Sequence, residues 1–327
     1  MNKQLLERQR HKIFDNAMAT LTDENDPLIK QTISFAIRYM IEAVYVKNSE
    51  IAIQYFRWML DHLVHKGYGS TLVKTSFETI KHELHTLIGD NITTEINFET
   101  ITNAPSSLNH FDKESDSAYK PYLNALFNRD KNEAYNIVHT LIKQEMTVSD
   151  IYSKIIQPSM YEIGYLWQTG KINIADEHLA TVISQYVMTT LYPIIFSTPK
   201  HPIKAVGTAI GKERHEIGIR MIMDMFEYHG YQTQYLGANT PQESFIAFAR
   251  DFAPDIIALS LTLSIHFSEL KSTIDAIRND PLLSHVKIII GGQPFSTNPE
   301  LIEMAGADGY AATIDEALKE GDRLVEY

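Results

Sequence analysis

Cysteine is absent from the 327-residue sequence, which excludes a disulfide framework and a metal site built on thiolates. The sequence also has no apolar run close to the roughly 20 residues that a membrane-spanning helix needs. Its opening stretch, MNKQLLERQRHK, is charged and lacks the apolar core of a signal peptide. These absences predict a cytoplasmic protein that has no membrane partner.

Basic residues are too few to give the chain a positive surface. The 29 Lys and Arg residues are outnumbered by 41 Asp and Glu residues, so the formal net charge is −12. Such a charge argues against a broad phosphate-binding surface. The first 90 residues also show no helix-turn-helix pattern with a basic recognition helix. We therefore expect no direct binding to nucleic acid.

The hydrophobic pattern divides the chain into four parts. Residues 1–90 have the apolar spacing of a small helical bundle, with expected helices at 3–21, 27–46, 49–65 and 70–88. The polar stretch 91–117 indicates a linker. Residues 118–200 show four more helices, and residues 201–327 alternate short strands with helices. The predicted fold class is therefore α and α/β, ending in a flavodoxin-like, five-stranded parallel sheet.

Two histidine pairs lie at i, i+3 spacing in the first part: His62 with His65, and His82 with His85. This spacing puts both rings of a pair on one helical face, where four imidazoles could hold a metal ion. The alternative is that they are polar or interhelical histidines of an amphipathic bundle. We favour the second interpretation because no carboxylate stands at a clear ligand spacing.

The second helical part contains two local signals. Its third expected helix, 148–167, contains Pro158, which predicts a kink. Asn173 is placed to cap the fourth helix, with Asp176 and Glu177 in the first turn, where acidic side chains are favourable.

The segment 204–239 carries the clearest candidate site. An apolar run at 205–210 predicts a buried strand, a polar loop follows, and a helix with one apolar face leads to a second strand at 231–236. His215 therefore follows the carboxyl end of a parallel strand, the edge at which open α/β sheets bind ligands.

His215 belongs to an E-x-H-x-x-G pattern with Glu213 and Gly218. A neutral imidazole is a good ligand for cobalt, iron or zinc, and a carboxylate can fix its tautomer. Gly218 removes a side chain where a bulky group could approach the backbone. The alternative is a histidine that only caps a helix.

The remainder of the last part resembles the cobalamin-binding domain of methionine synthase, corrinoid carrier proteins and cobalamin photoreceptors. The resemblance rests on E-x-H-x-x-G, then Ser260-Leu261-Thr262, then Gly291-Gly292. It implies that His215 is the lower cobalt ligand, in place of the dimethylbenzimidazole of the cofactor, and that Glu213 is its partner. It also implies a slot for the nucleotide tail lined by Ser260, Thr262, Gly291 and Gly292. The turn at Gly237 is expected to line the corrin.

The preceding helical part, taken as 118–200, resembles the four-helix cap of cobalamin proteins. It contains Q-P-x-M-Y-E-I-G-x-L-W followed by A-D-E-H-L-A-T, so that Trp167, nine residues, Glu177 and His178 form W-x9-E-H. That spacing is similar to the light-sensing cobalamin-dependent repressors, and it implies that the three side chains surround a 5′-deoxyadenosyl group. Two departures are the lack of a DNA-binding domain and Gln168 where the repressors have a histidine.

The resemblance predicts a photoreceptor or sensor without catalytic turnover. It would bind adenosylcobalamin with the histidine on cobalt, and light would change the conformation of the cap and the assembly. A homo-oligomer or a separate signalling partner would receive the signal. A linear tetrapyrrole such as biliverdin is a possible second chromophore for the N-terminal bundle. The alternative is a corrinoid methyl carrier that serves a separate methyltransferase, which shares the cap and the histidine loop.

Overall fold

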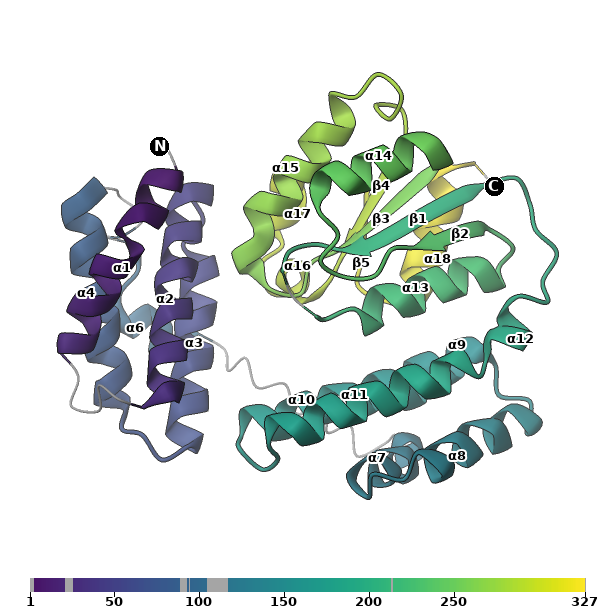
Figure 1. Cartoon of the computed structure of the whole chain (residues 1–327), viewed down its shortest axis with the longest axis horizontal. Coiled ribbons are helices and arrows are strands. Elements are labelled where there is room, and N and C mark those ends of the chain that lie inside the picture. The colour runs from purple at the N-terminus through teal and green to yellow at the C-terminus, as the bar shows by residue number, and fades with distance from the viewer. Residues whose placement is uncertain are drawn as a thin grey trace. The chain divides into compact units, whose positions relative to one another are not determined.

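The computed structural model describes residues 3–20, 26–88, 93, 95–104, 117–212 and 214–326. It forms two compact units, shown in Figure 1. The first unit combines Met1–His110 with the short segment Tyr165–Ile172, and the second combines Phe111–Gly164 with Asn173–Tyr327.

The first unit contains the predicted helical bundle. Its helices are α1 (Lys3–Ala19), α2 (Pro27–Val46), α3 (Glu50–His65), α4 (Ser70–Ile88) and the short α6 (Phe98–Asn103). The start of α2 is well defined, because the Asp26 side chain accepts hydrogen bonds from the backbone nitrogens of Leu28 and Ile29. Phe56 of α3 packs edge-on against Phe77 of α4, with 5.0 Å between ring centroids. Each helix carries apolar residues on one face, and burial of these faces explains why the helices associate.

The stretch predicted to be a linker contains one short helix. A capping box between Asn97 and Thr100 begins α6, and Arg57 of α3 donates a hydrogen bond of 2.8 Å to the carbonyl of Thr102. The described residues do not include 89–92, 94 and 105–116. The predicted linker boundaries at 91 and 117 therefore stay predictions.

A helical layer opens the second unit. Its elements are η1 (Ser117–Tyr119), α7 (Lys120–Phe127), α8 (Lys131–Lys143), α9 (Val148–Asp150), the π-helical turn η2 (Ile151–Ile156), α10 (Gln157–Gln168), α11 (Ile174–Thr189) and α12 (Tyr192–Ile195). The end of α10, from Tyr165 onward, is counted with the first unit. The distortion expected near Pro158 takes the form of η2, which ends just before that proline. Asn173 caps α11 as predicted and forms a capping box with Asp176.

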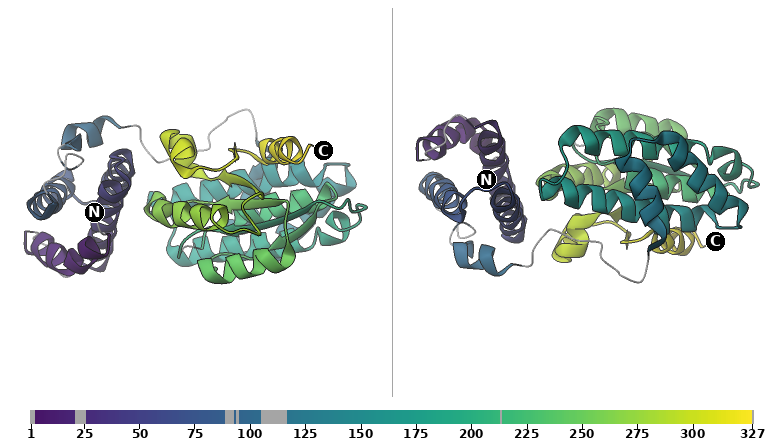
Figure 2. Two further views of the ribbon diagram at one scale, coloured as in Figure 1. Left: turned by 90° about the horizontal axis from the view of Figure 1, so that it is seen from above. Right: turned by 90° about the horizontal axis from the view of Figure 1, so that it is seen from below.

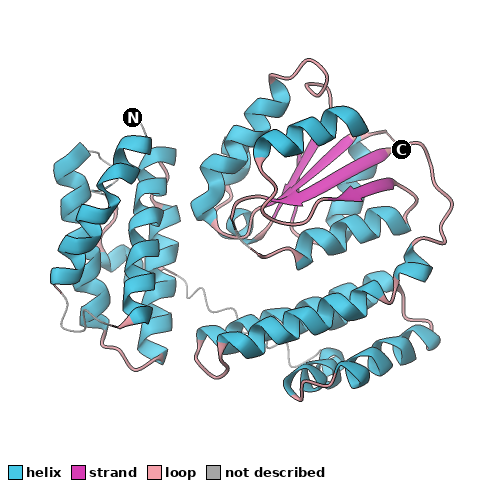
Figure 3. Cartoon of the chain, in the orientation of Figure 1, coloured by secondary structure: helices cyan, strands magenta, loops and turns pink. Residues whose placement is uncertain are grey.

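Five parallel strands form the sheet of the second unit, and Figure 3 shows them between helices. They are β1 (Lys204–Ala209), β2 (Gln232–Tyr235), β3 (Ile256–Ser260), β4 (Lys287–Gly291) and β5 (Gly309–Ala311), in the spatial order β2-β1-β3-β4-β5. This order is the flavodoxin-like one, so the predicted fold class is confirmed.

Helices cover both faces of the sheet, as Figures 1 and 2 show. One face carries α13 (Ile217–Tyr228) and α18 (Ile314–Leu324), which contact each other. The other face carries α14 (Gln242–Phe252), α15 (Phe267–Arg278) and α17 (Glu300–Ala305), while η3 (Ser264–His266) and α16 (Gln293–Thr297) lie in the connections. Within the described residues, no helix is both long enough and apolar enough to cross a bilayer.

The carboxyl ends of β3 and β4 approach each other too closely for a side chain. Gly292 has φ +121°, and a Cβ added there would lie 1.9 Å from the carbonyl oxygen of Leu261. The Gly-Gly pair is therefore required by backbone packing at this edge, whatever else it contacts.

Gly292→Ala should lower the free energy of unfolding by at least about 2 kcal/mol, because it adds strain at positive φ to a clash with backbone. Urea unfolding followed by circular dichroism measures this loss. Gly218→Ala is the matched control, since a Cβ at Gly218 meets nothing within 4 Å. An unchanged stability for Gly292→Ala would contradict the described backbone approach.

Candidate functional site

Several predicted site residues meet at one edge of the sheet. Ala209 of β1 is in register with Ser260 of β3, which is in register with Gly291 of β4. The backbone nitrogen of Ile210 donates a hydrogen bond of 2.8 Å to the carbonyl of Ser260. The loop that carries His215 therefore begins beside Ser260 and Gly291, as parallel pairing requires.

The loop between β1 and α13 presents His215 to solvent. Gly211 allows the turn, with φ +92°, and lies under the buried ring of His266, where a Cβ would come within 2.4 Å of the imidazole. His215 and Gly218 are both exposed, and the space beside Gly218 is open. Glu213 lies outside the described residues, so its predicted partnership with His215 stays a prediction.

The turn after β2 closes beside this loop. Gly237 has φ +73°, and its carbonyl accepts hydrogen bonds from the nitrogen of Ala209 at 3.1 Å and the hydroxyl of Thr208 at 2.9 Å. A Cβ at Gly237 would lie 3.5 Å from a carboxylate oxygen of Glu216. The predicted site residue Gly237 is therefore a neighbour of the His215 loop. Thr262 follows β3 and is half-buried.

One face of α11 is apolar and exposed. The helix buries Ala180, Ile183 and Val187, which lie on the side that packs on α7 and α8. The opposite side carries exposed residues at helical spacing: His178, Leu179, Val182 and Tyr186. Val182 is 59% exposed and Tyr186 is 47% exposed, which is unusual for large apolar side chains gathered on one face.

This exposed face adjoins the His215 loop. Gln185, which lies between Val182 and Tyr186 along α11, donates a hydrogen bond of 2.9 Å from Nε2 to Glu216. Figure 1 shows α11 running beside α13, the helix that follows the loop. An exposed imidazole, an apolar helix face and an open glycine position thus occur together, and this combination fits a flat apolar macrocycle with a metal at its centre.

The three residues of the W-x9-E-H pattern are divided between the two units. Glu177 and His178 belong to the second unit and contact each other, with 2.6 Å between a carboxylate oxygen and Nδ1. Trp167 belongs to the first unit, where its ring lies 6.4 Å from that of Trp58 and 5.7 Å from that of His62. The predicted pocket made by all three side chains stays a prediction.

A polar stripe on α13 was not among the predicted site features. Glu216, Arg220 and Asp224 lie at i, i+4 and i+8, on one face of a helix that is otherwise mostly apolar. All three bond to the helical layer: Glu216 to Gln185, Arg220 to Thr189 and Tyr192 at 2.8 and 2.9 Å, and Asp224 to Tyr152 at 2.8 Å. The four-residue spacing of these charges could have been noticed in the sequence, but their partners could not.

Burial changes the proton affinity of this stripe. Asp224 is 7% exposed, and burial raises the pKa of its carboxyl to about 6, although the hydrogen bond from Tyr152 and the charge of Arg220 oppose the rise. Burial also raises the pKa of the Tyr152 hydroxyl, and the neighbouring Asp224 charge adds to it. Tyr152 therefore acts as the hydrogen donor to Asp224.

Three histidines of the predicted pairs lie within hydrogen-bond distance of an oxygen atom. Nδ1 of His62 lies 2.7 Å from the carbonyl of Gln168, that of His65 lies 2.7 Å from the carbonyl of Asp61, and that of His85 lies 2.9 Å from the hydroxyl of Thr93. Among the described residues, no cluster of three or more His, Asp or Glu side chains is arranged to hold a metal ion.

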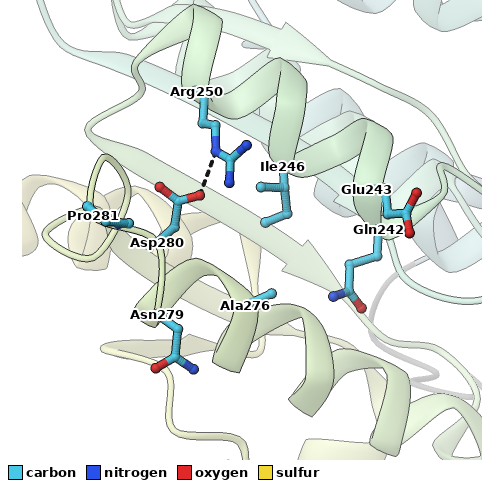
Figure 4. Close-up of a pocket in the computed structure, with 8 residues that line it drawn as sticks. All are labelled: Gln242, Glu243, Ile246, Arg250, Ala276, Asn279, Asp280 and Pro281. Carbon is cyan, nitrogen blue, oxygen red and sulfur yellow. Dashed lines mark hydrogen bonds and ion pairs between the residues drawn. The ribbon is translucent and has the colours of Figure 1, made fainter.

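Figure 4 shows a shallow pocket between α14 and α15. It is crossed by the ion pair of Arg250 and Asp280 and includes no predicted site residue. We assign it no part in the site.

Two family models, each described as a B12 binding domain, match this chain. One matches residues 118–192, the helical layer, and the other matches residues 203–319, the sheet domain. The chain therefore contains a cobalamin-binding module, in which a helical cap precedes a flavodoxin-like sheet. Neither match reaches residues 1–117.

Among known proteins, the chain is similar to several that are named as corrinoid proteins. The chain is 25% identical over 186 residues to dimethylamine corrinoid protein 1 of Methanosarcina acetivorans, which covers 56% of this chain and 86% of that protein. It is 27% identical over 189 residues to the dimethylamine corrinoid protein of Methanosarcina barkeri, with 56% and 86% covered. The solved monomethylamine corrinoid protein of M. barkeri has a TM-score of 0.57 at 20% identity, covering 64% of this chain and 98% of that one, and this likeness shows the fold.

The prediction of a light sensor was wrong. The relatives above are named as corrinoid proteins of dimethylamine and monomethylamine, not as photoreceptors. The prediction had relied on the W-x9-E-H spacing, but that spacing does not require the three side chains to share a pocket. The expectation that the chain is not itself an enzyme agrees with these relatives, which are named as corrinoid proteins.

His215→Ala should abolish nitrogen coordination of cobalt by the protein, because this imidazole is the exposed one that follows β1. Electron paramagnetic resonance of the Co(II) form, with ¹⁵N-labelled histidine, measures the coupling. His229→Ala, which alters the far end of α13, is the control and should retain it. Retained coupling in His215→Ala would refute the assignment.

Asp224→Asn should stabilise the protein more at pH 8 than at pH 5. The pKa of the Asp224 carboxyl in the folded state, about 6, exceeds its ordinary value of 3.8. The contribution of this carboxyl to the free energy of unfolding therefore falls as the pH rises from about 4 to 6 and is constant above that. The variant should raise the free energy of unfolding by at most about 3 kcal/mol. The groups that face Asp224 are Tyr152, Tyr192, Arg220 and Glu227.

Urea unfolding at both pH values measures this difference, and the exposed Asp275→Asn is the control. Equal effects of Asp224→Asn at pH 5 and pH 8 would contradict a carboxyl with a raised pKa.

Proposed function

We propose that the chain is a corrinoid methyl carrier that serves a separate methyltransferase. The observation that carries the proposal is the exposed apolar face of α11 next to the His215 loop, joined through Gln185 and Glu216, within segments that match B12-binding domains. The relatives named for dimethylamine support the same function.

Each part of the site has a proposed role. His215 would ligate the cobalt, and Gly218 would leave room for the ring beside the first turn of α13. The tail slot is lined by Ser260, Thr262, Gly291 and Gly292, and Gly237 borders the corrin. When bound, the corrinoid supplies a cobalt centre on which a methyl group passes between a donor and an acceptor. The apolar side chains of α11 would give the corrinoid site an apolar border that limits the access of water.

A second proposal concerns the ligand on the other side of the corrinoid from His215. Trp167, the aromatic residue expected against an adenosyl group, contacts Trp58 and His62 in the first unit. We therefore propose methyl and hydroxo forms, rather than adenosylcobalamin, as the working ligands. In the N-terminal bundle the aromatic rings pack on one another, Tyr39 on Tyr55 at 4.2 Å for example, and we propose no biliverdin there.

The exposed apolar face of α11 also indicates what kind of partner the protein has. A methyl carrier must present one face of its corrinoid to another active site, and large exposed apolar patches mark such contact surfaces. A methyltransferase that contacts Leu179, Val182 and Tyr186 is the expected partner, in place of a signalling partner.

Affinity for the three cobalamins in the dark tests the proposal. Methyl- and hydroxocobalamin should bind at least as tightly as adenosylcobalamin, by spectral titration of the purified apoprotein. Trp167→Ala should change all three affinities equally, because the Trp167 ring packs against Trp58 of α3. A preference for adenosylcobalamin of roughly tenfold or more, about 1.4 kcal/mol, would contradict the carrier function.

Methylation provides an independent test. The hydroxocobalamin-loaded protein, reduced with titanium(III) citrate and given methyl iodide, should acquire the methylcobalamin spectrum. A loaded and reduced protein that fails to become methylated would overturn the proposal.

A further inference from the structure

Glu216, the residue next to His215, joins two layers of the second unit. One carboxylate oxygen accepts a hydrogen bond of 2.9 Å from Nε2 of Gln185 on α11. The other accepts a hydrogen bond of 3.1 Å from the hydroxyl of Tyr235, the last residue of β2. The side chain is therefore held from the helical layer on one side and from the sheet on the other.

The backbone of Glu216 is fixed as well. Its nitrogen donates a hydrogen bond of 2.9 Å to the carbonyl of Arg214, and its own carbonyl accepts one of 3.0 Å from the nitrogen of Arg220. Glu216 stands at the N-cap position of α13, between the turn at Gly211, which has a positive φ, and a regular helix. A displacement of the Glu216 side chain would therefore also displace the neighbouring residues Arg214 and His215.

The contact with Gln185 is part of a regular arrangement. Gln185 and Thr189 are one turn apart on α11, and their partners Glu216 and Arg220 are one turn apart on α13. Arg220 has a second hydrogen bond, to Tyr192, whereas the side chain of Glu216 is joined to α11 through Gln185. A displacement of α11 would therefore alter the end of the stripe that adjoins His215.

We propose that Glu216 is a positioning residue that couples docking of α11 to the orientation of His215. The inference rests on the proposed function, in which His215 is the lower cobalt ligand. When α11 is docked, Gln185 and Tyr235 hold the Glu216 carboxylate and keep the loop in the conformation that presents the imidazole. When α11 moves away, a half-buried carboxylate loses a donor and the loop relaxes.

The coupling works in both directions. A ligand that fixes His215 favours the docked state of α11, and a partner that displaces α11 weakens the hold on His215, by the same free energy. A methyltransferase that contacts the exposed face of α11 could therefore change the lower coordination of cobalt without contacting that side of the site.

Gln185→Glu provides the sharpest perturbation, because it replaces the donor with a carboxylate facing the carboxylate of Glu216. The exchanged pair, Gln185→Glu with Glu216→Gln, restores an amide and a carboxylate with their roles reversed. Thr189→Ala is the matched control, since it removes the neighbouring contact to Arg220 and leaves Glu216 untouched.

Two measurements follow these variants. In the cobalamin-loaded Co(II) protein, electron paramagnetic resonance with ¹⁵N-labelled histidine gives the ratio of histidine-bound to unbound cobalt. In the apoprotein, hydrogen exchange gives the protection of the 210–216 loop and of α11. Gln185→Glu should lower the ratio roughly tenfold and raise exchange in both segments, because a bond to a charged acceptor is lost. The exchanged pair should recover both quantities, and Thr189→Ala should retain wild-type values.

The outcomes separate this inference from the proposed function. If wild-type protein shows no histidine coupling, the proposed function fails, and the inference falls with it. If wild-type coupling is present but Gln185→Glu leaves it and the exchange of 210–216 unchanged, only the coupling through Glu216 is overturned. A loss in Gln185→Glu that the exchanged pair does not recover would also overturn it, since general damage to α11 would then explain the effect.

Discussion

In-register pairing of parallel strands is the constraint on which the site depends. Because β1, β3 and β4 end side by side, Ser260 and Gly291 lie next to the start of the loop that presents His215. Gly292 lies so close to the backbone of Leu261 that no side chain fits, so the packing of this sheet edge requires glycine there. A change of register in any of the three strands would separate these residues.

The second requirement is a polar contact between layers that are otherwise apolar. α13 packs Ile219, Met223 and Phe226 toward the sheet, yet its other side carries Glu216, Arg220 and Asp224 toward the helical layer. Buried apolar contact alone would favour association in many relative positions, whereas three hydrogen-bonded charges one turn apart favour one. Burial raises the pKa of the Asp224 carboxyl, so we expect its ionised form at neutral pH to cost part of the stability that these contacts add.

Most of the fold could be predicted because its signals are local. The four-residue spacing of apolar residues, the Asn173 cap and the Gly-rich strand ends all act within one element, and the structure has them where the sequence places them. The same holds for His215, whose position follows from the strand before it. Glu213 remains untested because it lies outside the described residues.

What the sequence could not show are the partners of side chains in different elements. Trp167 is 109 residues from Trp58, and no local pattern indicates that their rings meet. The W-x9-E-H spacing suggested a light sensor, which the relatives contradict, while the pocket that it implies stays a prediction. Likewise, Glu216 could be seen as a charged residue on α13, but not as a bridge from Gln185 to Tyr235, since these lie on two other elements.

The π-helical turn Ile151–Ile156 sets the rotational phase of α10. A π turn contains one residue more than an α-helical turn would use, so the side chains after it are rotated by about 100° relative to an uninterrupted helix. Tyr161, which is 53% exposed, and Gly164, beside which the space is open, both lie on α10 after this turn. Homologous chains that lack it by a one-residue deletion would present a different side of α10, and alignments across this turn should be anchored on Tyr152 and on Pro158 separately.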